Sequence, residues 1–302
     1  MSSRKYAKPE DFKQALENHL KKHAVTASVD VARMRQRWVF ERFLARLALH
    51  FGDKMILKGG VALALRHPGA RFTHDVDLRL SGDQDRLAVE LSAAGKLRAD
   101  EDFLSLTVEP DPKHPTIEAE GLKYGGQRFR VEAALAGKVY GARFGLDVVF
   151  GDTMAAPAEI ILGSDLFAFA SVPPIQVLAY AREVHLAEKV HAFTASRARE
   201  NTRVKDLPDI ALLALTGPFE SHAVRAAIQV TFDARTTHPL PAAVPPPPES
   251  WRVPYARMAQ ENGLRWTSLD EITEVVRAFL DPVLRGDEGT WDPPTWTWRR
   301  HE

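Results

Sequence analysis

The spacing of apolar positions changes along the chain, and each change indicates a different kind of structure. In the first part, apolar residues recur every three or four positions, as in Phe12, Leu16 and Leu20. This is the period of an amphipathic helix. It predicts helices over residues 9–22 and 29–51.

Short apolar runs then alternate with helical segments, and the middle of the chain is rich in strand-forming residues bounded by Gly and Pro. The predicted strands in this part cover residues 55–57, 76–80, 103–108, 127–133 and 144–150. The predicted helices between them cover residues 60–66 and 83–97. Helices between early strands, followed by consecutive strands, predict a mixed sheet with helices on one face.

Beyond Pro173 the helical period returns. The predicted elements are a strand over 175–180 and helices over 182–199, 208–215, 221–233, 251–263 and 268–284. We therefore predict an α+β fold, with N-terminal helices and a mixed-sheet core in residues 1–172 and a mainly helical C-terminal domain in residues 173–302. The prolines of residues 238–248 predict an extended connector. The tryptophans of residues 291–298 should pack on the body of the protein or on a partner.

The composition excludes several chemistries and indicates a compartment. Of the 302 residues, 45% are hydrophobic and 26% are charged, which is ordinary for a soluble globular protein. Forty basic residues balance 40 acidic ones, so net charge points to no particular partner. The lack of cysteine excludes disulfides and thiolate chemistry and fits a reducing compartment. Because no secretion signal or membrane-length apolar run is present, we expect a cytoplasmic protein without a membrane partner.

Candidate chemistry is concentrated in residues 57–78. The twin glycines Gly59 and Gly60 precede a short apolar helix, and they allow backbone N–H groups to approach a triphosphate at the positive end of that helix. Asp75 and Asp77 then alternate at the start of a strand, so both carboxylates face one side. Such a pair can hold divalent metal between carboxylate and phosphate oxygens.

Asp147 supplies a third carboxylate in a strand setting, where a lone charge is costly unless it is paired or metal-bound. On a neighbouring strand it would complete a cluster with Asp75 and Asp77, whose mutual repulsion a magnesium ion relieves. Asp152 is the alternative third member. Structural roles remain open for each of the three: Asp75 as a turn cap, Asp77 paired with a nearby arginine, and Asp147 as an edge residue. His74 is expected to face away from the metal.

These residues predict nucleotidyl transfer, which asks a protein mainly for positioning and charge neutralisation. Two ions, Mg²⁺ or Mn²⁺, would bridge Asp75 and Asp77. One would coordinate the triphosphate of an NTP, and the other would use Asp147 and lower the pKa of the attacking hydroxyl. Asp147 can alternatively serve as the general base. The amides of Gly59 and Gly60 would hold the terminal phosphates.

Four motifs in order along the chain extend this interpretation. They are LKGGVAL at 57–63, RFTHDVDL at 71–78, LAEKVHAF at 186–193 and RVKDLPDI at 203–210. Together they resemble the AbiEii/AbiGii-type nucleotidyltransferase toxins, including mycobacterial relatives, within the polymerase-beta-like superfamily. The resemblance implies a polymerase-beta-like nucleotidyltransferase core and a toxin that is one half of a bacterial toxin–antitoxin pair.

The resemblance also implies roles for residues that the local pattern alone leaves open. It implies a catalytic Lys189 that contacts nucleotide phosphates, and Asp209 as the last catalytic acid, orienting Lys189 or the acceptor. Without the resemblance, the local pattern indicates a solvated lysine at Lys189 and, at Asp209, an acid favoured by the helix dipole. The predicted catalytic residues are Asp75, Asp77, Lys189 and Asp209. The predicted nucleotide-binding residues are Lys58, Gly59, Gly60, Arg71 and Lys189.

Members of this family add nucleotides from an NTP to RNA, and in characterised relatives the acceptor is the 3′ end of tRNA, which blocks aminoacylation and translation. The implied partners are an NTP, the tRNA acceptor end and an antitoxin encoded next to the toxin. Candidate RNA-binding cations are Arg66, Arg71, Lys123, Arg128, Arg130, Arg197, Arg199, Arg203 and Lys205. The alternatives are transfer to a protein or small-molecule hydroxyl, and a nucleotide- or antitoxin-binding module without turnover. The preferred NTP, the tRNA species, the mode of neutralisation and the oligomeric state stay open.

Overall fold

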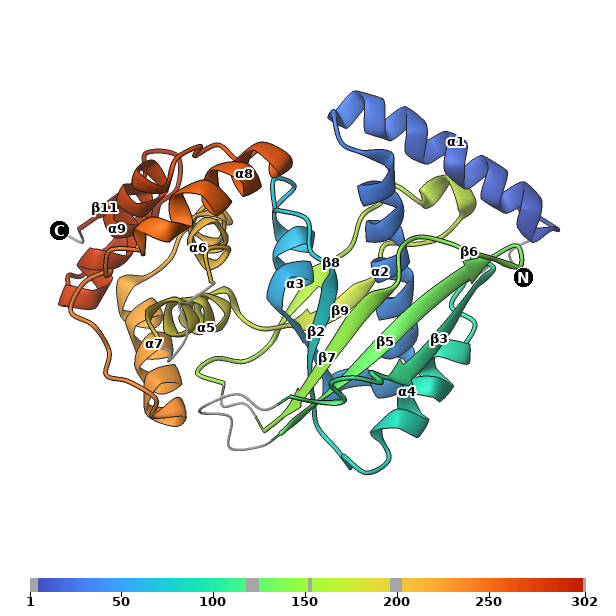
Figure 1. The fold of residues 1–302 in the computed structure, drawn as a ribbon, viewed down its shortest axis with the longest axis horizontal. Coiled ribbons are helices and arrows are strands. Elements are labelled where there is room, and N and C mark those ends of the chain that lie inside the picture. Colours follow the sequence, from blue (N-terminus) through green and yellow to red (C-terminus); the bar gives the residue numbers. More distant parts are fainter. Residues whose placement is uncertain (1–4, 101, 118–124, 152–153, 196–202, 301–302) are drawn as a thin grey trace.

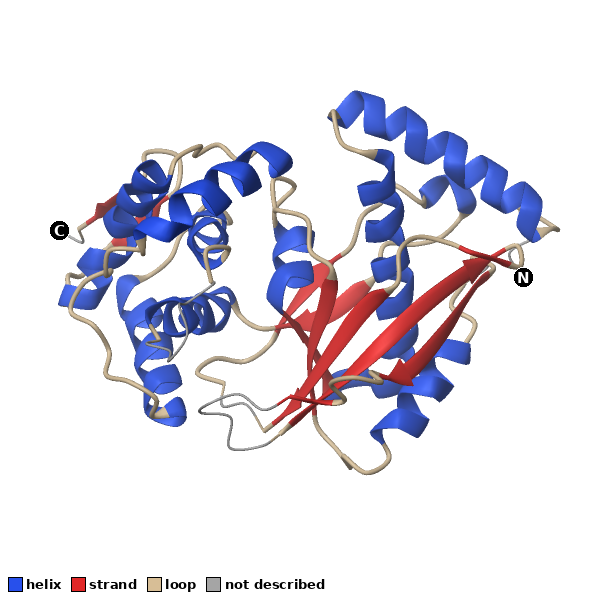
Figure 2. Cartoon of the chain, in the orientation of Figure 1, coloured by secondary structure: helices blue, strands red, loops and turns tan. Residues whose placement is uncertain are grey.

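A computed structural model describes residues 5–100, 102–117, 125–151, 154–195 and 203–300 of the chain. A strand-rich N-terminal half lies beside a mainly helical C-terminal half (Figure 1). Figure 2 shows the same division by type of element. The helices are α1 (Pro9–Ala27), α2 (Val31–Phe51), α3 (Gly59–Arg66), α4 (Leu87–Lys96), α5 (Arg182–Thr194), α6 (Asp206–Ala214), α7 (Ser221–Arg235), α8 (Arg252–Asn262) and α9 (Leu269–Arg285). The strands are β1 (Met55–Lys58), β2 (Asp75–Leu80), β3 (Leu104–Pro110), β4 (Thr116–Ile117), β5 (Gly126–Leu135), β6 (Lys138–Val139), β7 (Phe144–Phe150), β8 (Glu159–Leu162), β9 (Gln176–Ala179), β10 (Thr290–Asp292) and β11 (Thr297–Arg299).

The N-terminal half is built on one mixed sheet, whose main path runs β3-β5-β7-β2-β1-β9-β8. The central strand β2 is parallel to β7 and antiparallel to β1. Beyond β7, the strands β5 and β3 continue as antiparallel neighbours. The mixed sheet and the helical second half are the α+β fold predicted from the sequence.

Side-chain alternation separates the two faces of the central strands. Val76 and Leu78 of β2 are fully buried, and so are Leu146 and Val148 of β7. The aspartates between them point to the opposite face, because successive side chains of a strand alternate. The sheet therefore has one face for the core and one face free for chemistry.

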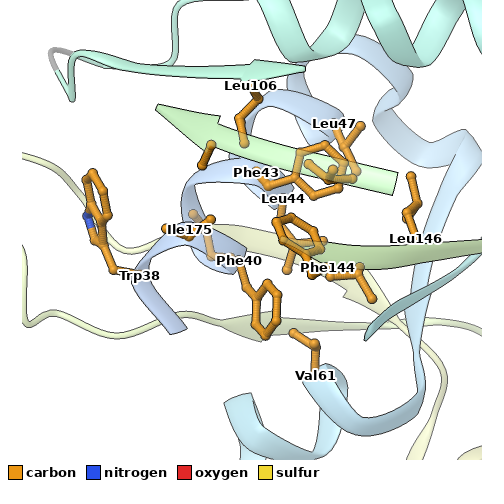
Figure 3. Packing of buried hydrophobic residues seen from close by; sticks show 14 of the residues in the cluster. Trp38, Phe40, Phe43, Leu44, Leu47, Val61, Leu106, Phe144, Leu146 and Ile175 are labelled. Atoms are coloured by element: carbon orange, nitrogen blue, oxygen red, sulfur yellow. The ribbon is translucent and has the colours of Figure 1, made fainter. Parts of the chain in front are cut away.

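Helix α2 packs on the apolar face. Figure 3 shows its residues Phe40, Phe43, Leu44 and Leu47 gathered around Phe144 of β7. The rings of Phe43 and Phe144 meet edge to face, with 5.5 Å between their centroids. Each side chain of this kind contributes roughly 1.5–3 kcal/mol when fully buried. This packing fixes β7, and with it the carboxylate that β7 carries on its other face.

A second hydrophobic core holds the C-terminal half together, from Leu186 of α5 to Trp291 of β10, and takes in Leu63 of α3. Trp291 is fully buried, and its indole Nε1 donates to the carbonyl of Ala214 at 2.9 Å. The tryptophan-rich tail thus packs on the body of the protein, as a hairpin of β10 and β11. Strand β9 belongs to the sheet and the first core, although it follows Pro173. The division at residues 172/173 stays a prediction.

Some boundaries differ from the sequence-based expectations. Helix α1 continues past Lys22 because Ala24 extends its buried stripe. Helix α4 begins at Leu87 instead of Asp83. The short edge strand β8 was not predicted, because its few residues carry no clear alternation. The end of the helix predicted over 182–199 lies partly outside the described residues. Among the helices that the structure describes, none is both long enough and apolar enough to cross a membrane.

Candidate active site

A row of charged side chains crosses the polar face of the sheet. Lys58 of β1 lies opposite Asp77 of β2, Asp77 lies opposite Asp147 of β7, and Asp147 lies opposite Arg128 of β5. Residues directly opposite one another share a face of the sheet. Two carboxylates are therefore flanked by a cation at each end of the row, and the strand register brings the four together.

The twin-glycine turn passes so close to β2 that side chains would not fit. Gly59 has φ +68°, and a Cβ on it would lie 1.9 Å from Oδ2 of Asp77. A Cβ on Gly60 would lie 2.7 Å from Oγ1 of Thr73. Helix α3 begins at Gly59, so its unpaired N–H groups and positive dipole end start beside Asp77. The glycines thus bring a helix N-terminus against a carboxylate.

The negative charge of Asp77 is only partly compensated by the cations around it. Burial raises the pKa of Asp77, Asp147 and Asp75 add to the shift, and Lys58 and Lys189 oppose it. Asp75 is exposed at the start of β2, and its Oδ1 is 2.5 Å from the position that a Cβ on Gly145 would take. A cation bound between these side chains would relieve the repulsion.

Asp147 is held by Arg128 through two hydrogen bonds. The guanidinium donates from Nε to Oδ1 at 2.7 Å and from Nη2 to Oδ2 at 2.8 Å. Within the described ranges, no three His, Asp or Glu side chains come together as a metal-binding group. Asp75 and Asp77 still suit Mg²⁺, which proteins commonly hold through one or two carboxylates together with substrate phosphates. The donor set fits an ion that is also coordinated by substrate phosphates.

A second charged cluster lies across from the sheet, between α5 and α6. Lys189 Nζ is 2.7 Å from Oδ2 of Asp209 and 3.2 Å from Oδ1 of Asp206. Arg71 donates to both oxygens of Asp209, each at 2.9 Å. Arg203 donates to Asp206 at 2.7 Å. Both carboxylates are fully buried and fully paired.

The pKa shifts in this cluster follow from that pairing. Burial alone would raise the pKa of Asp209, but Lys189 and Arg71 outweigh it and hold the pKa well below its usual range. Burial alone would lower the pKa of Lys189, but Asp209 and Asp206 outweigh it and raise the pKa. Lys189 therefore stays charged, in a fixed place.

The two clusters face a common cavity of about 640 Å³. Its basic lining residues are Lys58, Arg71, Arg128, Lys189, Arg203, Lys205 and Arg235. Its acidic lining residues are Asp75, Asp77, Asp147 and Glu188. Partial burial and nearby Arg71 and Arg203 lower the pKa of Lys205, as expected where positive charge is in excess. The cavity suits a polyanion on one side and a cation on the other.

Comparison with protein families decides what kind of protein carries this cavity. The family model described as nucleotidyl transferase AbiEii toxin, type IV toxin–antitoxin system, matches residues 42–291. The chain belongs to this AbiEii family. It is a nucleotidyltransferase toxin of a toxin–antitoxin system, and family membership implies an NTP substrate and a cognate antitoxin.

Two solved structures are similar to this chain, and the first of them supports the fold. The nucleotidyltransferase toxin MenT4 from Mycobacterium tuberculosis is similar at TM-score 0.56 and 17% identity, over 93% of this chain and 92% of that one. JHP933 from Helicobacter pylori is similar at TM-score 0.46 and 16% identity, over 83% of this chain and 92% of that one. The comparison with curated protein sequences returns no match.

The residues predicted from the AbiEii-like motifs meet in one place. Each of the four motifs contributes a candidate residue: Lys58, Gly59, Gly60, Arg71, Asp75, Asp77 and Lys189 line the cavity, and Asp209 binds Lys189 and Arg71. Asp147, which was predicted from its strand setting outside the motifs, lines the same cavity. Of the candidate RNA-binding cations, Lys123, Arg197 and Arg199 lie outside the described residues, as does Asp152. Arg66 lies elsewhere, bound to Glu159 and the carbonyl of Tyr180.

Several partnerships in this AbiEii site were not predicted. Asp206 forms no side-chain cap at the start of α6 and instead binds Lys189 and Arg203. Glu188 accepts from Lys58 at 3.1 Å and from Arg235 at 2.8 Å, so it joins the sheet to α7. Asp206 was detectable as a charged residue next to Asp209; nothing in the sequence links Glu188 to a residue as distant as Lys58.

Proposed function

We propose that this AbiEii toxin is a metal-dependent nucleotidyltransferase that adds nucleotides from an NTP to the 3′ end of tRNA, blocking aminoacylation and translation in the cytoplasm. The observation that carries the proposal is the cavity between the two clusters. The carboxylates of the sheet line one wall together with Lys58 and Arg128, the cations around α5 and α6 line the other, and α3 begins beside Asp77. Nucleotidyl transfer needs these three features together.

The chain's own residues have distinct tasks in this proposal. The N–H groups at Gly59 and Gly60 bind phosphate oxygens, with the α3 dipole behind them. Lys189, fixed by Asp209 and Asp206, neutralises phosphate charge from the opposite wall. Asp75 and Asp77 would hold Mg²⁺ or Mn²⁺. When bound, that ion would neutralise triphosphate charge and make the acceptor hydroxyl more acidic.

Asp147 is the remaining carboxylate in the row, and Arg128 orients it. In that orientation Asp147 contributes negative charge next to Asp77 without needing to bind metal itself. Release from Arg128 would free it to bind a second ion or to accept the proton of the acceptor hydroxyl. Both roles belong to the proposal, because each uses the two carboxylate oxygens of Asp147.

The test is transfer of label from each of the four NTPs, with labelled α-phosphate, to total tRNA. We expect label at the tRNA 3′ end with at least one NTP, and loss of that label in Asp77→Ala. Asp53→Ala is the matched control, because Asp53 is an exposed aspartate of the same half that lines no cavity of the site. Its activity should equal that of the wild type.

The other outcomes separate the alternatives. Label on protein, or on a small hydroxyl compound, with none on tRNA would replace the tRNA proposal by one of transfer to that acceptor. Binding of NTP with no transfer to any acceptor would identify a nucleotide- or antitoxin-binding module. Activity that survives removal of divalent metal by chelation would contradict the metal requirement.

A further inference from the structure

The active-site cavity continues sideways into two further cavities along the sheet. The neighbouring cavity, of about 390 Å³, shares Asp75 and Arg128 with it. A third cavity, of about 720 Å³, shares His74 with the second and extends between α1, α2 and the β6–β7 connection. Each cavity shares lining residues with the next, so the three lie in a row from the carboxylates of β2 toward α1, and we call this row the passage.

His74 lines both outer cavities, and its ring contacts that of Phe72, which lines the third cavity. The rings of Phe72 and His74 are 4.8 Å apart and perpendicular. His74 is exposed and directly precedes Asp75. Phe72 is held from both halves of the molecule: Arg33 of α2 lies over its ring at 5.6 Å, and its N–H donates to Oδ1 of Asn262 at 2.9 Å. The exposed ring of His74 is therefore backed by a fixed neighbour.

Arginines line the middle of the passage. Arg130 and Arg143 are exposed by 44% and 65% of their side chains. They pair with Asp111 and Glu132, which are themselves 16% and 31% exposed. Guanidinium groups so exposed can exchange a surface carboxylate for phosphate at little cost, since surface ion pairs are worth about 0–1 kcal/mol. The passage thus offers backbone contacts beside a stacking surface.

We propose that this passage binds the single-stranded 3′ end of the RNA acceptor, with an unpaired base stacked on His74 and its backbone phosphates on Arg130 and Arg143. This inference rests on the proposed function, because it assigns a route for the acceptor to that same site. Stacking on an aromatic side chain requires a base that is free of pairing. With its base on His74, the strand is held one residue from Asp75, next to the active-site cavity.

Binding alone tests the route without needing transfer. The probe is a fluorescent RNA hairpin with a single-stranded 3′ tail, compared with the same hairpin with a blunt end, by fluorescence anisotropy. His74→Ala should weaken binding of the tailed hairpin about ten-fold, the effect of losing one stacked base. His74→Phe should keep the affinity, and so should His222→Ala, which removes an exposed histidine of α7 outside the passage. Unchanged melting temperatures verify that the variants fold.

Salt dependence tests the arginines independently. For single strands, log affinity falls with log salt by about 0.7 for each phosphate contact. The double variant Arg130→Ala/Arg143→Ala should therefore lower the slope by about 1.4. Arg285→Ala, which removes an exposed arginine paired with Asp287 at the end of α9, should leave the slope unchanged. An unchanged slope in the double variant would show that Arg130 and Arg143 do not contact backbone phosphates, which contradicts the proposed binding route.

Kinetics separates failure of the inference from failure of the proposed function. If tRNA is labelled, His74→Ala should raise the KM for tRNA about ten-fold and leave the KM for NTP unchanged. Equal tRNA KM in the wild type and His74→Ala, or equal binding of tailed and blunt hairpins, would overturn the inference while leaving transfer intact. Tail binding that depends on His74, without transfer to any RNA, would support the inference and reject the proposed function. Labelling of a protein with no affinity for the RNA tail would overturn both.

Discussion

The active-site cavity lies between two groups of carboxylates that have opposite electrostatic surroundings. On the sheet, Asp77 is next to two further carboxylates, and burial together with that repulsion raises its pKa. On α6, Asp209 is next to Lys189 and Arg71, which hold its pKa well below the usual range. Both are carboxylates near one cavity, so the difference comes from their neighbours alone.

The difference indicates different roles for the two groups. The sheet carboxylates are suited to binding a cation, and Asp209 stabilises the fold and fixes other side chains. Asp209 is charge-balanced within the protein, and its bonds fix Lys189 and Arg71 at the cavity wall. Asp77 of the sheet, in contrast, keeps a raised pKa although Lys58 and Lys189 lie near it. Such a group gains most from a cation supplied with the substrate. Changes on the sheet should therefore affect activity, and changes on α6 should affect stability as well.

The largest effect is expected from Asp77→Asn, which keeps the shape but removes the charge next to Gly59 and Asp147. Nucleotide transfer should fall by at least about a thousand-fold, equal to roughly 4 kcal/mol in the barrier. The free energy of unfolding should stay level or rise, because like-charge repulsion in the row is relieved. Initial rates of transfer and urea unfolding measure the two quantities. A large loss of stability in this variant would contradict the conclusion that the sheet carboxylates affect activity and not stability.

Asp209→Asn comes next and should act through the fold. It leaves Arg71 buried with a neutral partner and Lys189 with Asp206 as its remaining carboxylate, and breaking a buried pair costs about 3–5 kcal/mol. Urea unfolding should show most of that loss, together with reduced transfer. Asp287→Asn is the control, because it breaks a surface pair with Arg285 that is about half exposed and should cost less than about 1 kcal/mol. Equal costs for the two variants would show that the buried pairing is not supporting the fold.

The contrast also explains which features the sequence could predict. Patterns of neighbouring residues are sufficient to predict the α+β class. They also predict that Asp75 and Asp77 face away from the apolar residues of β2, because side chains of a strand alternate between its two faces. The motifs of the AbiEii-like family add Lys189 and Asp209. The ion-pair partners of these residues follow no such local pattern. Arg128 contacts Asp147 only because of the register of β5 on β7.

The same limit applies to the second half of the site. Arg71 and Asp209 are far apart in sequence, and either has several charged residues closer to it along the chain. Asp209 could be assigned its partner only after α6 was placed against the loop that precedes β2. Tertiary packing decides such pairings, so they cannot be predicted from a single sequence.

Added metal should give a smaller effect that is confined to the sheet. If Asp75 and Asp77 hold Mg²⁺ in the free protein, an ion at ten times its Kd stabilises the fold by about 1.4 kcal/mol. The melting temperature of the wild type should rise with MgCl₂ and return on chelation. Asp77→Asn should not respond. Asp53→Asn, with its exposed and distant carboxylate, should respond like the wild type. A wild type that does not respond would mean that the ion binds only together with the nucleotide.

The smallest effect is a difference in how stability depends on pH, at most about 1.4 kcal/mol per pH unit for one group. A raised folded pKa means that the folded protein holds the proton of Asp77 longer than the unfolded chain does. The contribution of Asp77 to stability therefore falls as pH rises from about 4, the unfolded value, through its folded pKa. The contribution of Asp209, with its lowered pKa, is complete above about pH 4 and is lost as pH falls below it. Urea unfolding in chelator should show Asp77→Asn becoming more stable relative to the wild type as pH rises above about 4, and the deficit of Asp209→Asn shrinking as pH falls below about 4. Shifts of the same sign in both variants would contradict the opposite surroundings of the two groups.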